Sequence, residues 1–194
     1  GLICVGTPKG VDLFSSTIVT VKGIKIGFLS LETINGLPED NAVRAELTRL
    51  ASSSDTQVVL VHWGNEYSRT HSSEQELLAH TLIDYGADTI IGHHPHVIQD
   101  IALYKDKPIF YSLGNFIFDQ YFSDEVQEEL AVEMKLSDTD IVYTLIPFTS
   151  TTTQSQPNFM TETQKKTVFQ RVLPDTTSSS TIDRENGIIK VRKD

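Results

Sequence analysis

The chain has 194 residues, of which 39% are hydrophobic, enough for one domain with a substantial core. Its 26 acidic residues outnumber its 16 basic residues, which gives a net charge of −10 at pH 7. This balance argues against nucleic acid or an anionic membrane surface as a partner, and an anionic substrate would need a local cation in order to bind.

The first residues of the chain include its cysteine and show how the sequence begins. Cys4 is the only cysteine, so no internal disulfide forms, and its apolar surroundings favour a buried, inert thiol over a reactive one. No segment approaches the roughly 18 consecutive apolar residues of a membrane helix. The opening stretch GLICVGTPKG has neither an initiator Met nor a signal-peptide pattern, which indicates a fragment or a processed product.

The first predicted elements are a hairpin, a helix and a strand. The stretch STIVTVKGIKIGFLSLE is rich in β-branched residues, and Lys22 and Gly23 at its middle predict a turn between two strands. Weakly periodic apolar positions then predict a helix over residues 41–51. The continuous apolar run QVVLVHW is typical of a strand that is buried on both faces.

A strand–helix–strand pattern follows. Ser72, Ser73 and Glu76 resemble a capping box that opens a helix over residues 73–85, and Gly86 is a natural stop for it. The predicted apolar face of this helix consists of Leu77, Leu78, Leu82 and Ile83. The short run ADTIIG is the next buried strand, so the pattern predicts a parallel strand pair covered by helices, and hence an α/β protein.

The second half of the chain predicts two further hairpins. VIQDIALYKDKPIFYSLGNFIF contains a turn at 105–107, and ELAVEMKLSDTDIVYTLIPF contains one at 137–139. Residues 149–158 predict a loop, and residues 161–173 predict a helix that Pro174 ends. DTTSSST is low in complexity and typical of a mobile segment, whereas GIIKVRK predicts a last strand.

Four histidines lie at predicted strand ends. His62 closes QVVLVHW, and His93, His94 and His96 follow ADTIIG. Adjacent parallel strands bring such residues to one edge of a sheet, where functional groups gather. Pro95 favours an extended His94, so that His94 and His96 converge while His93 faces elsewhere. Because neutral imidazole is a common ligand for Zn, Mn and Fe, we predict a metal site at His62, His94 and His96; hydrogen-bonded packing is the alternative.

Other polar residues near these motifs are weaker candidates. Glu66 lies four residues after His62, where it would orient a ligand or act as an acid or base; plain solvation is the alternative. Asp84 is the other acid near the motifs in sequence. His71 and His80 are expected at the surface, because one lies in a polar loop and the other on a helix.

The Gly114-Asn115 pair in YSLGNFIFD resembles the start of the Gly-Asn-His-Glu element of metallophosphatases. Phe116 stands where the histidine belongs, and the segment follows the histidine motif instead of preceding it, so this assignment is rejected. Asn115 remains a candidate for lining the site. The aromatic residues here are predicted as core, namely Phe110, Tyr111, Phe116 and Phe118. Trp63 fits a pocket wall and simple packing equally well.

Three motifs together carry a family resemblance. VHWGNEY, GADTIIGHHPHVIQD and KPIFYSLGNFIFDQ, in this order and spacing, resemble the poly-γ-glutamate capsule biosynthesis protein CapA family, within the calcineurin-like metallophosphoesterase superfamily. The resemblance implies a metallophosphoesterase-like α/β sandwich with a divalent metal ion at its strand ends, of Mn, Zn or Fe. His62, His94 and His96 match family histidines, and His93 matches a position that the family fills more loosely. Glu66 and Asn115 match further motif residues.

The family's early elements have no counterpart in this sequence. They are an Asp near the N-terminus, an Asn-Leu-Glu segment and an Asn-Asn-His segment, which supply much of the metal shell. Residues 1–173 therefore resemble the C-terminal portion of such a domain, and residues 174–194 are predicted as a low-complexity segment and tail. Three imidazoles suffice for one ion, but a two-metal site would lack its bridging carboxylate, which implies that this portion alone is incomplete for catalysis.

The sequence is compatible with three functions. The first is synthesis or export of an anionic capsule polymer such as poly-γ-glutamate, with metal-assisted hydrolysis or transfer. The second is a general metallophosphoesterase, and the third is a non-catalytic polymer-binding or scaffold module of a membrane synthase complex. The expected partners are an anionic polymer or a phosphate-containing substrate, together with membrane synthase subunits. The expected location is outside the cytoplasm, at a membrane, through a segment absent from this chain.

Overall fold

The computed structural model describes residues 2–8, 10–175 and 180–193, which form two compact units. Unit 1 comprises Gly1–Asn65 and Ser72–His94, and unit 2 comprises Glu66–His71 and Pro95–Asp194. Part of the predicted low-complexity segment, residues 176–179, lies outside the described residues. Within the described part of the chain, no helix is long and apolar enough to cross a membrane.

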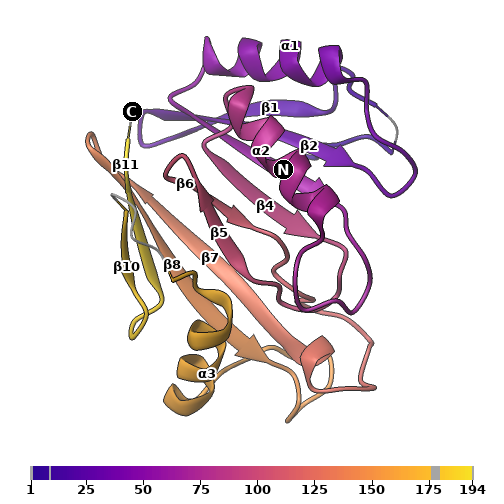
Figure 1. Cartoon of the computed structure of the whole chain (residues 1–194), viewed down its shortest axis with the longest axis vertical. Coiled ribbons are helices and arrows are strands. Elements are labelled where there is room, and N and C mark those ends of the chain that lie inside the picture. The colour runs from indigo at the N-terminus through magenta and orange to yellow at the C-terminus, as the bar shows by residue number, and fades with distance from the viewer. Residues whose placement is uncertain (1, 9, 176–179, 194) are drawn as a thin grey trace. The chain divides into compact units, whose positions relative to one another are not determined.

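Unit 1 is built on four strands in the order β1-β2-β3-β4 (Figure 1). They are β1 (Ser16–Val21), β2 (Ile24–Glu32), β3 (Thr56–His62) and β4 (Thr89–His93). β1 is antiparallel to β2, and β2, β3 and β4 run parallel to one another. Lys22 and Gly23 both have positive φ, as a two-residue turn matched to the strand twist requires. The predicted hairpin and the parallel strand pair are therefore confirmed.

Two helices cover strands of this sheet. α1 (Asp40–Ala51) contacts β2 and β3, and α2 (Ser73–Asp84) contacts β4. The buried residues of α1 are Val43, Leu47 and Leu50, whose spacing follows the helical period. The weak periodicity of the sequence therefore predicted this helix correctly.

The capping box of α2 differs by one residue from the prediction. The Ser72 hydroxyl accepts a hydrogen bond from the Gln75 backbone N–H, and the Gln75 side chain accepts one from the Ser72 N–H. The residues that α2 buries are Gln75, Ala79, Leu82 and Ile83, whereas Leu77 is 71% exposed. The predicted apolar face was therefore wrong at Leu77, because the buried stripe begins at Gln75 and a residue two positions further along a helix points to the opposite side. Gly86, with φ of 114°, follows the helix as predicted.

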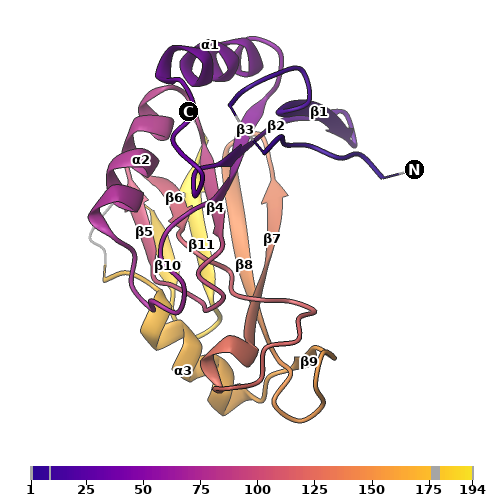
Figure 2. The same ribbon diagram turned by 90° about the vertical axis from the view of Figure 1, so that its right-hand side faces the viewer.

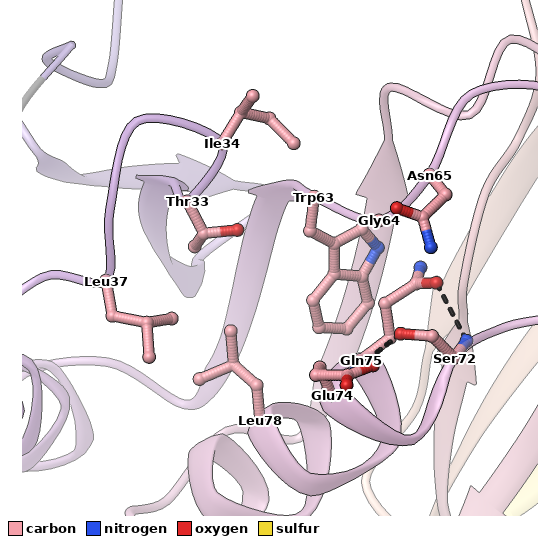
Figure 3. A pocket seen from close by; sticks show the side chains of 10 residues that line it. All are labelled: Thr33, Ile34, Leu37, Trp63, Gly64, Asn65, Ser72, Glu74, Gln75 and Leu78. Atoms are coloured by element: carbon pink, nitrogen blue, oxygen red, sulfur yellow. Dashed lines mark hydrogen bonds between the residues drawn. The ribbon is translucent and has the colours of Figure 1, made fainter.

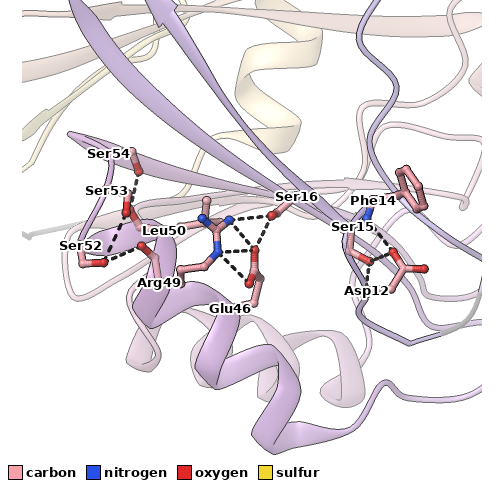
Figure 4. Close-up of polar contacts among 10 residues, drawn as sticks. All are labelled: Asp12, Phe14, Ser15, Ser16, Glu46, Arg49, Leu50, Ser52, Ser53 and Ser54. Atoms are coloured by element: carbon pink, nitrogen blue, oxygen red, sulfur yellow. Dashed lines mark hydrogen bonds and ion pairs between the residues drawn. The ribbon is translucent and has the colours of Figure 1, made fainter.

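A polar network ties α1 to the edge strand β1. The Glu46 carboxylate accepts hydrogen bonds from the Arg49 guanidinium and from the Ser16 hydroxyl (Figure 4). These bonds, with that of Arg49 first, hold the pKa of Glu46 below its ordinary value despite partial desolvation. The Arg49 guanidinium also donates to the Ser16 hydroxyl at 3.0 Å, so both side chains of α1 bind the edge strand.

The core of unit 1 is centred on β3. Leu29 on β2, Val59 on β3 and Ile90 on β4 are fully buried. Because β3 lies between two parallel strands and is covered by helices, its apolar run is buried almost throughout, as the sequence predicted. The parallel arrangement also places the carboxyl ends of β2, β3 and β4 at one edge.

Unit 2 combines a short hairpin with a larger sheet (Figure 2). The hairpin pairs β5 (Ile101–Tyr104) with β6 (Lys107–Phe110) across the predicted turn. The larger sheet has the order β10-β11-β8-β7, and β9 pairs with β8. Its strands are β7 (Glu128–Leu136), β8 (Asp140–Thr149), β9 (Asn158–Phe159), β10 (Thr181–Asp183) and β11 (Ile188–Arg192).

The helices of unit 2 complete the predicted α/β composition. A short 3-10 helix, η1 (Glu125–Gln127), precedes β7, and α3 (Glu162–Val172) follows β9. The Thr161 hydroxyl and the Gln164 side chain form a capping box at the start of α3. The helix ends before Pro174, as predicted. The two very short strands β9 and β10 were not predicted from the sequence.

Besides that of Leu77, the predicted burial of Cys4, Phe116 and Phe118 was wrong. Cys4 is exposed, because the apolar stretch around it joins no strand or helix. Phe110 and Tyr111 are fully buried as predicted, but Phe116 and Phe118 are 52% and 43% exposed. Both exposed residues lie in the irregular segment after β6, beyond the isolated bridge that joins Gly114 to Glu129.

Candidate functional site

The carboxyl ends of three parallel strands in unit 1 present polar side chains in register. Glu32 at the end of β2 pairs with His62 at the end of β3, and His62 pairs with His93 at the end of β4. Residues in register on neighbouring strands face the same side of a sheet, so these three share a face. Glu32 was missed from the sequence, because only the strand register shows that it lies beside His62.

The Glu32 carboxylate is held by the turn that follows it. It accepts hydrogen bonds from the backbone N–H groups of Ile34 and Asn35, at 2.5 and 3.1 Å. Desolvation raises the pKa of Glu32, but the hydrogen bonds from Asn35 and Ile34 outweigh it and lower the pKa below its ordinary value. Glu32 therefore carries a negative charge beside His62 at neutral pH.

The imidazoles of His62 and His94 meet within unit 1. The distance between His62 Nε2 and His94 Nδ1 is 3.1 Å, and the ring centroids are 4.7 Å apart at 60°. The predicted proximity of these two residues is therefore observed. The predicted extended backbone at His94 is not observed, because the φ of this residue is 102°. Pro95 disfavours the helical region for the residue before it but does not by itself fix that residue in a strand conformation.

His93 lies closer to this pair than we expected. Its register places it beside His62, on the same face of the sheet. Although the residue as a whole is exposed, the pKa of its imidazole is lowered, because nearby protein displaces water from the ring and because a charge on His62 opposes its own. The expectation that His93 faces away from the other rings does not fit this arrangement.

In unit 2, Asn115 orients His96. The Asn115 amide nitrogen donates to the Val126 carbonyl at 2.9 Å, and this bond assigns the amide oxygen to the side of His96. That oxygen lies 2.9 Å from His96 Nδ1. Because a carbonyl oxygen only accepts, His96 Nδ1 carries a proton, and Nε2 is the nitrogen that is not bonded to Asn115. Asn115 thus lines the candidate site, as the sequence suggested, and sets the tautomer of the histidine.

Glu66 lies beside the other nitrogen of the same ring. Its carboxylate is 3.7 Å from His96 Nε2, and its side chain is 50% exposed. The next residue, Tyr67, stacks on His96 at 5.9 Å between ring centroids, and its N–H donates to the Pro95 carbonyl. Phe118 contacts the ring from a further direction, at 5.2 Å between centroids. His96 is therefore held by an amide and contacts two aromatic rings, and the Glu66 carboxylate lies near its other ring nitrogen.

The loop that carries Glu66 is fixed by a buried amide. The Gln99 side chain, which is fully buried, donates to the carbonyls of Ser68 and Thr70 at 2.9 and 3.0 Å. His71 closes the same loop and is not the surface histidine that we expected. Its Nδ1 lies 2.7 Å from the Asp100 carboxylate. Its ring also stacks on that of Tyr111, at 3.9 Å between centroids. These contacts give His71 a structural role within unit 2.

The five predicted site residues are divided between the two units. His62 and His94 are together in unit 1, and Glu66, His96 and Asn115 are together in unit 2. In the sequence only Pro95 separates His94 from His96. His80 lies half-buried on α2, and Asp84 is exposed at the end of that helix.

The sequence is similar to proteins of capsule synthesis. It is 33% identical over 141 residues to the capsule biosynthesis protein CapA of Bacillus anthracis, which covers 72% of this chain and 34% of that protein. It is 39% identical over 113 residues to the PGA biosynthesis protein CapA of Bacillus subtilis, which covers 52% of this chain and 30% of that protein. The chain therefore spans about a third of the length of these relatives.

A solved structure and a family model give two further comparisons. A novel phosphatase from Mycoplasma pneumoniae is similar over 69% of this chain and 50% of its own, with a TM-score of 0.46 and 15% identity, a level that assigns no activity. The model of the bacterial capsule synthesis protein PGA_cap matches residues 1–120, which include all five predicted site residues. The chain belongs to the bacterial capsule synthesis protein family PGA_cap.

Proposed function

We propose that the chain acts in bacterial capsule biosynthesis, on poly-γ-glutamate or a similar anionic polymer, through a metal-dependent, hydrolase-like site. Family membership and the relatives named for capsule and PGA biosynthesis support the first part. The second part rests on the proposed ligands His62, His94 and His96. The observation that carries it is the 3.1 Å approach of two imidazole nitrogens, those of His62 and His94.

The donor atoms fit a divalent transition metal. Two histidine nitrogens bound to a tetrahedral Zn²⁺ at about 2.0–2.1 Å lie about 3.3 Å apart, close to the separation of the His62 and His94 nitrogens. Imidazole also suits Mn and Fe, so the donor set is compatible with any of the three ions. A direct N–H···N hydrogen bond is the alternative interpretation of the same distance, and metal binding distinguishes the two.

His96 supports the same proposal from its own cluster. The hydrogen bond to Asn115 places a proton on Nδ1, so Nε2 is the nitrogen of His96 that would bind a metal ion. A carbonyl partner on the other nitrogen also increases ligand basicity. Since one residue separates His94 from His96, we propose that both bind the same ion.

The residues of the chain have distinct roles in the proposed chemistry. A bound divalent cation would polarise a substrate oxygen and would supply the local positive charge that an acidic chain otherwise lacks. Glu66 is half exposed, so its carboxylate is accessible to a substrate and is placed to take or return a proton. Asn115 positions His96 and does not itself react.

We further propose that the chain works outside the cytoplasm, at a membrane, with subunits of a polymer synthase. The family's place in capsule synthesis supports this setting, because capsule polymers are delivered to the cell surface. The general phosphoesterase and the non-catalytic scaffold predict different outcomes in the experiment below.

The test is the metal content of the purified chain, measured by mass spectrometry after loading with Mn²⁺, Zn²⁺ or Fe²⁺. We expect about one equivalent in the wild type, loss of that ion in His94→Ala and in His96→Ala, and retention in His80→Ala. His80 is the matched control, because it is a half-buried histidine of unit 1 outside the cluster.

Each of the other possible outcomes would contradict one part of the proposed function. Equal metal in wild type and both cluster variants would refute the ligand assignment. A wild type without metal would favour the scaffold function. Chelator-sensitive turnover of an aryl phosphate, with no effect of the variants on polymer length in a capsule-forming host, would favour the general phosphoesterase.

A further inference from the structure

A pocket of about 520 Å³ opens in unit 1 where the chain leaves β2 and β3 and enters α2 (Figure 3). Pockets of this size are typical of small-molecule sites. Its lining consists of Thr33, Ile34, Leu37, Trp63, Gly64, Asn65, Ser72, Glu74, Gln75 and Leu78. None of these residues is a proposed metal ligand.

The pocket has an apolar side and a polar side. Figure 3 shows Ile34, Leu37 and Leu78 on one side of the Trp63 indole, and Asn65 with Gln75 on the other. Trp63 is only 1% exposed, so it forms the floor of the pocket. Ile34 and Leu37 are 45% and 74% exposed, so a ligand that covered them would remove apolar surface from water.

The pocket lining carries negative charge and no positive charge. Glu74 is the only ionisable residue among the ten that line it, and no cation does so. Its pKa is lowered, chiefly because the Ser72 hydroxyl hydrogen-bonds its carboxylate, so Glu74 is ionised at neutral pH. The other polar side chains of the lining, the hydroxyls of Thr33 and Ser72 and the amides of Asn65 and Gln75, both donate and accept hydrogen bonds. The Glu74 carboxylate is therefore the group that opposes a carboxylate or phosphate and favours a ligand with positive charge.

We propose that this pocket binds an aliphatic chain that ends in a primary ammonium group. The methylene stem would lie against Leu37 and Leu78, above the floor made by Trp63. The ammonium would pair with the Glu74 carboxylate. The source is either a free alkylamine or a lysine-like side chain of a peptide, since both present this group. The proposal stands apart from the metal chemistry above and does not depend on it.

The chain offers its own reporter, because Trp63 is its only tryptophan. Titration with n-pentylammonium, 1-pentanol and hexanoate, followed by tryptophan fluorescence and the indole N–H signal in NMR, reads the pocket directly. We expect n-pentylammonium to bind about threefold to fivefold more tightly than 1-pentanol, as an exposed ion pair allows, and hexanoate to bind more weakly than either. Added salt should reduce the advantage of the ammonium.

Two charge-neutralising variants separate the pocket from general electrostatics. Glu74→Gln should remove the preference for ammonium and leave the affinity for 1-pentanol unchanged. Glu76→Gln is the matched control, because Glu76 is exposed on the same helix outside the pocket, and it should keep the preference. N-acetyl-lysine methylamide distinguishes the sources: its binding indicates a peptide side chain, and its exclusion indicates a free amine.

Three results would overturn the proposal: no response of Trp63 to n-pentylammonium, binding of hexanoate at equal strength, or the same loss in Glu76→Gln as in Glu74→Gln. Measuring the metal content of the same variants separates the test of the pocket from the test of the metal site. His94→Ala should leave the amine titration unchanged, and Glu74→Gln should leave the metal content unchanged.

Discussion

Glu129 in unit 2 is a carboxylic acid whose ionisation should destabilise the folded chain. It lies on β7 with only 1% of its surface exposed. Burial raises its pKa to about 7, although a hydrogen bond with Ser150 acts in the opposite direction. Its Oε2 atom is buried and has no hydrogen-bond partner among the described residues. The folded state therefore prefers the protonated form.

The sign and the size of the effect follow from these values. The ordinary pKa of 4.5 applies to the unfolded chain, and about 7 applies to the folded chain. Between pH 4.5 and 7 the folded state keeps a proton that the unfolded state has lost, so the free energy of unfolding falls as the pH rises. Since a tenfold ratio corresponds to about 1.4 kcal/mol, the full loss above pH 7 is about 3 kcal/mol.

The variant Glu129→Gln removes this titration while nearly preserving the shape of the side chain. We expect its free energy of unfolding, relative to that of the wild type, to increase by about 2 to 3 kcal/mol between pH 5 and pH 8. Urea unfolding followed by far-UV circular dichroism measures both proteins at each pH. Comparing the two proteins cancels the other titrating groups.

Glu133→Gln is the matched control, because Glu133 is exposed on the same strand and pairs with Lys135 at 3.0 Å. Its unfolding should follow the pH dependence of the wild type to within about 0.5 kcal/mol. The reasoning about Glu129 is refuted when Glu129→Gln and the wild type lose stability in parallel from pH 5 to pH 8.

Three further variants test the backbone, the site and its supporting loop. Gly64→Ala should cost about 1–3 kcal/mol more than Gly23→Ala in urea unfolding. Both glycines have nearly the same positive φ, of 84° and 88°, but only a Cβ at Gly64 meets a side chain, that of Gln75 at 2.7 Å; equal costs would contradict this. Asn115→Ala should weaken metal binding about tenfold to a hundredfold in a chelator competition, and unchanged affinity would remove its positioning role. Gln99→Leu should speed amide hydrogen exchange in the loop whose carbonyls it binds, whereas unchanged exchange would show that other contacts hold the loop.

The elements of unit 1 were predictable because their signals are local. The apolar run of β3, the glycine turn before β2 and the hydrophobic spacing of α1 each determine an element within a few residues. The parallel pairing of β3 with β4 followed from the helix between them. The start of α2 at Ser73 was predicted correctly, but the partner in the capping box is Gln75 and not Glu76, since serines at 72 and 73 are both suitable caps and only the hydrogen bonds distinguish them.

Burial after β6 and before β1 could not be predicted, because it depends on distant neighbours. Phe116 and Phe118 look like core residues by type, but they lie beyond the bridge between Gly114 and Glu129, where the segment belongs to no strand. Cys4 is exposed for the same reason. The burial of Glu129 was not predicted, because Glu129 and Leu130 are buried in succession, against the alternation that is typical of a strand.

In the histidine motif, the sequence identified the candidate residues but did not predict their backbone conformation. We expected an extended chain through Pro95, whereas His94 and His96 both have positive φ, of 102° and 62°. Such conformations cost about 1–3 kcal/mol each in residues with a side chain, and they persist only where the surrounding contacts determine them. Here the contacts are those of His94 with His62 and of His96 with Asn115. Strain of this kind on both sides of one proline is typical of a functional site, and it supports the proposed ligands independently of the distance between any two rings.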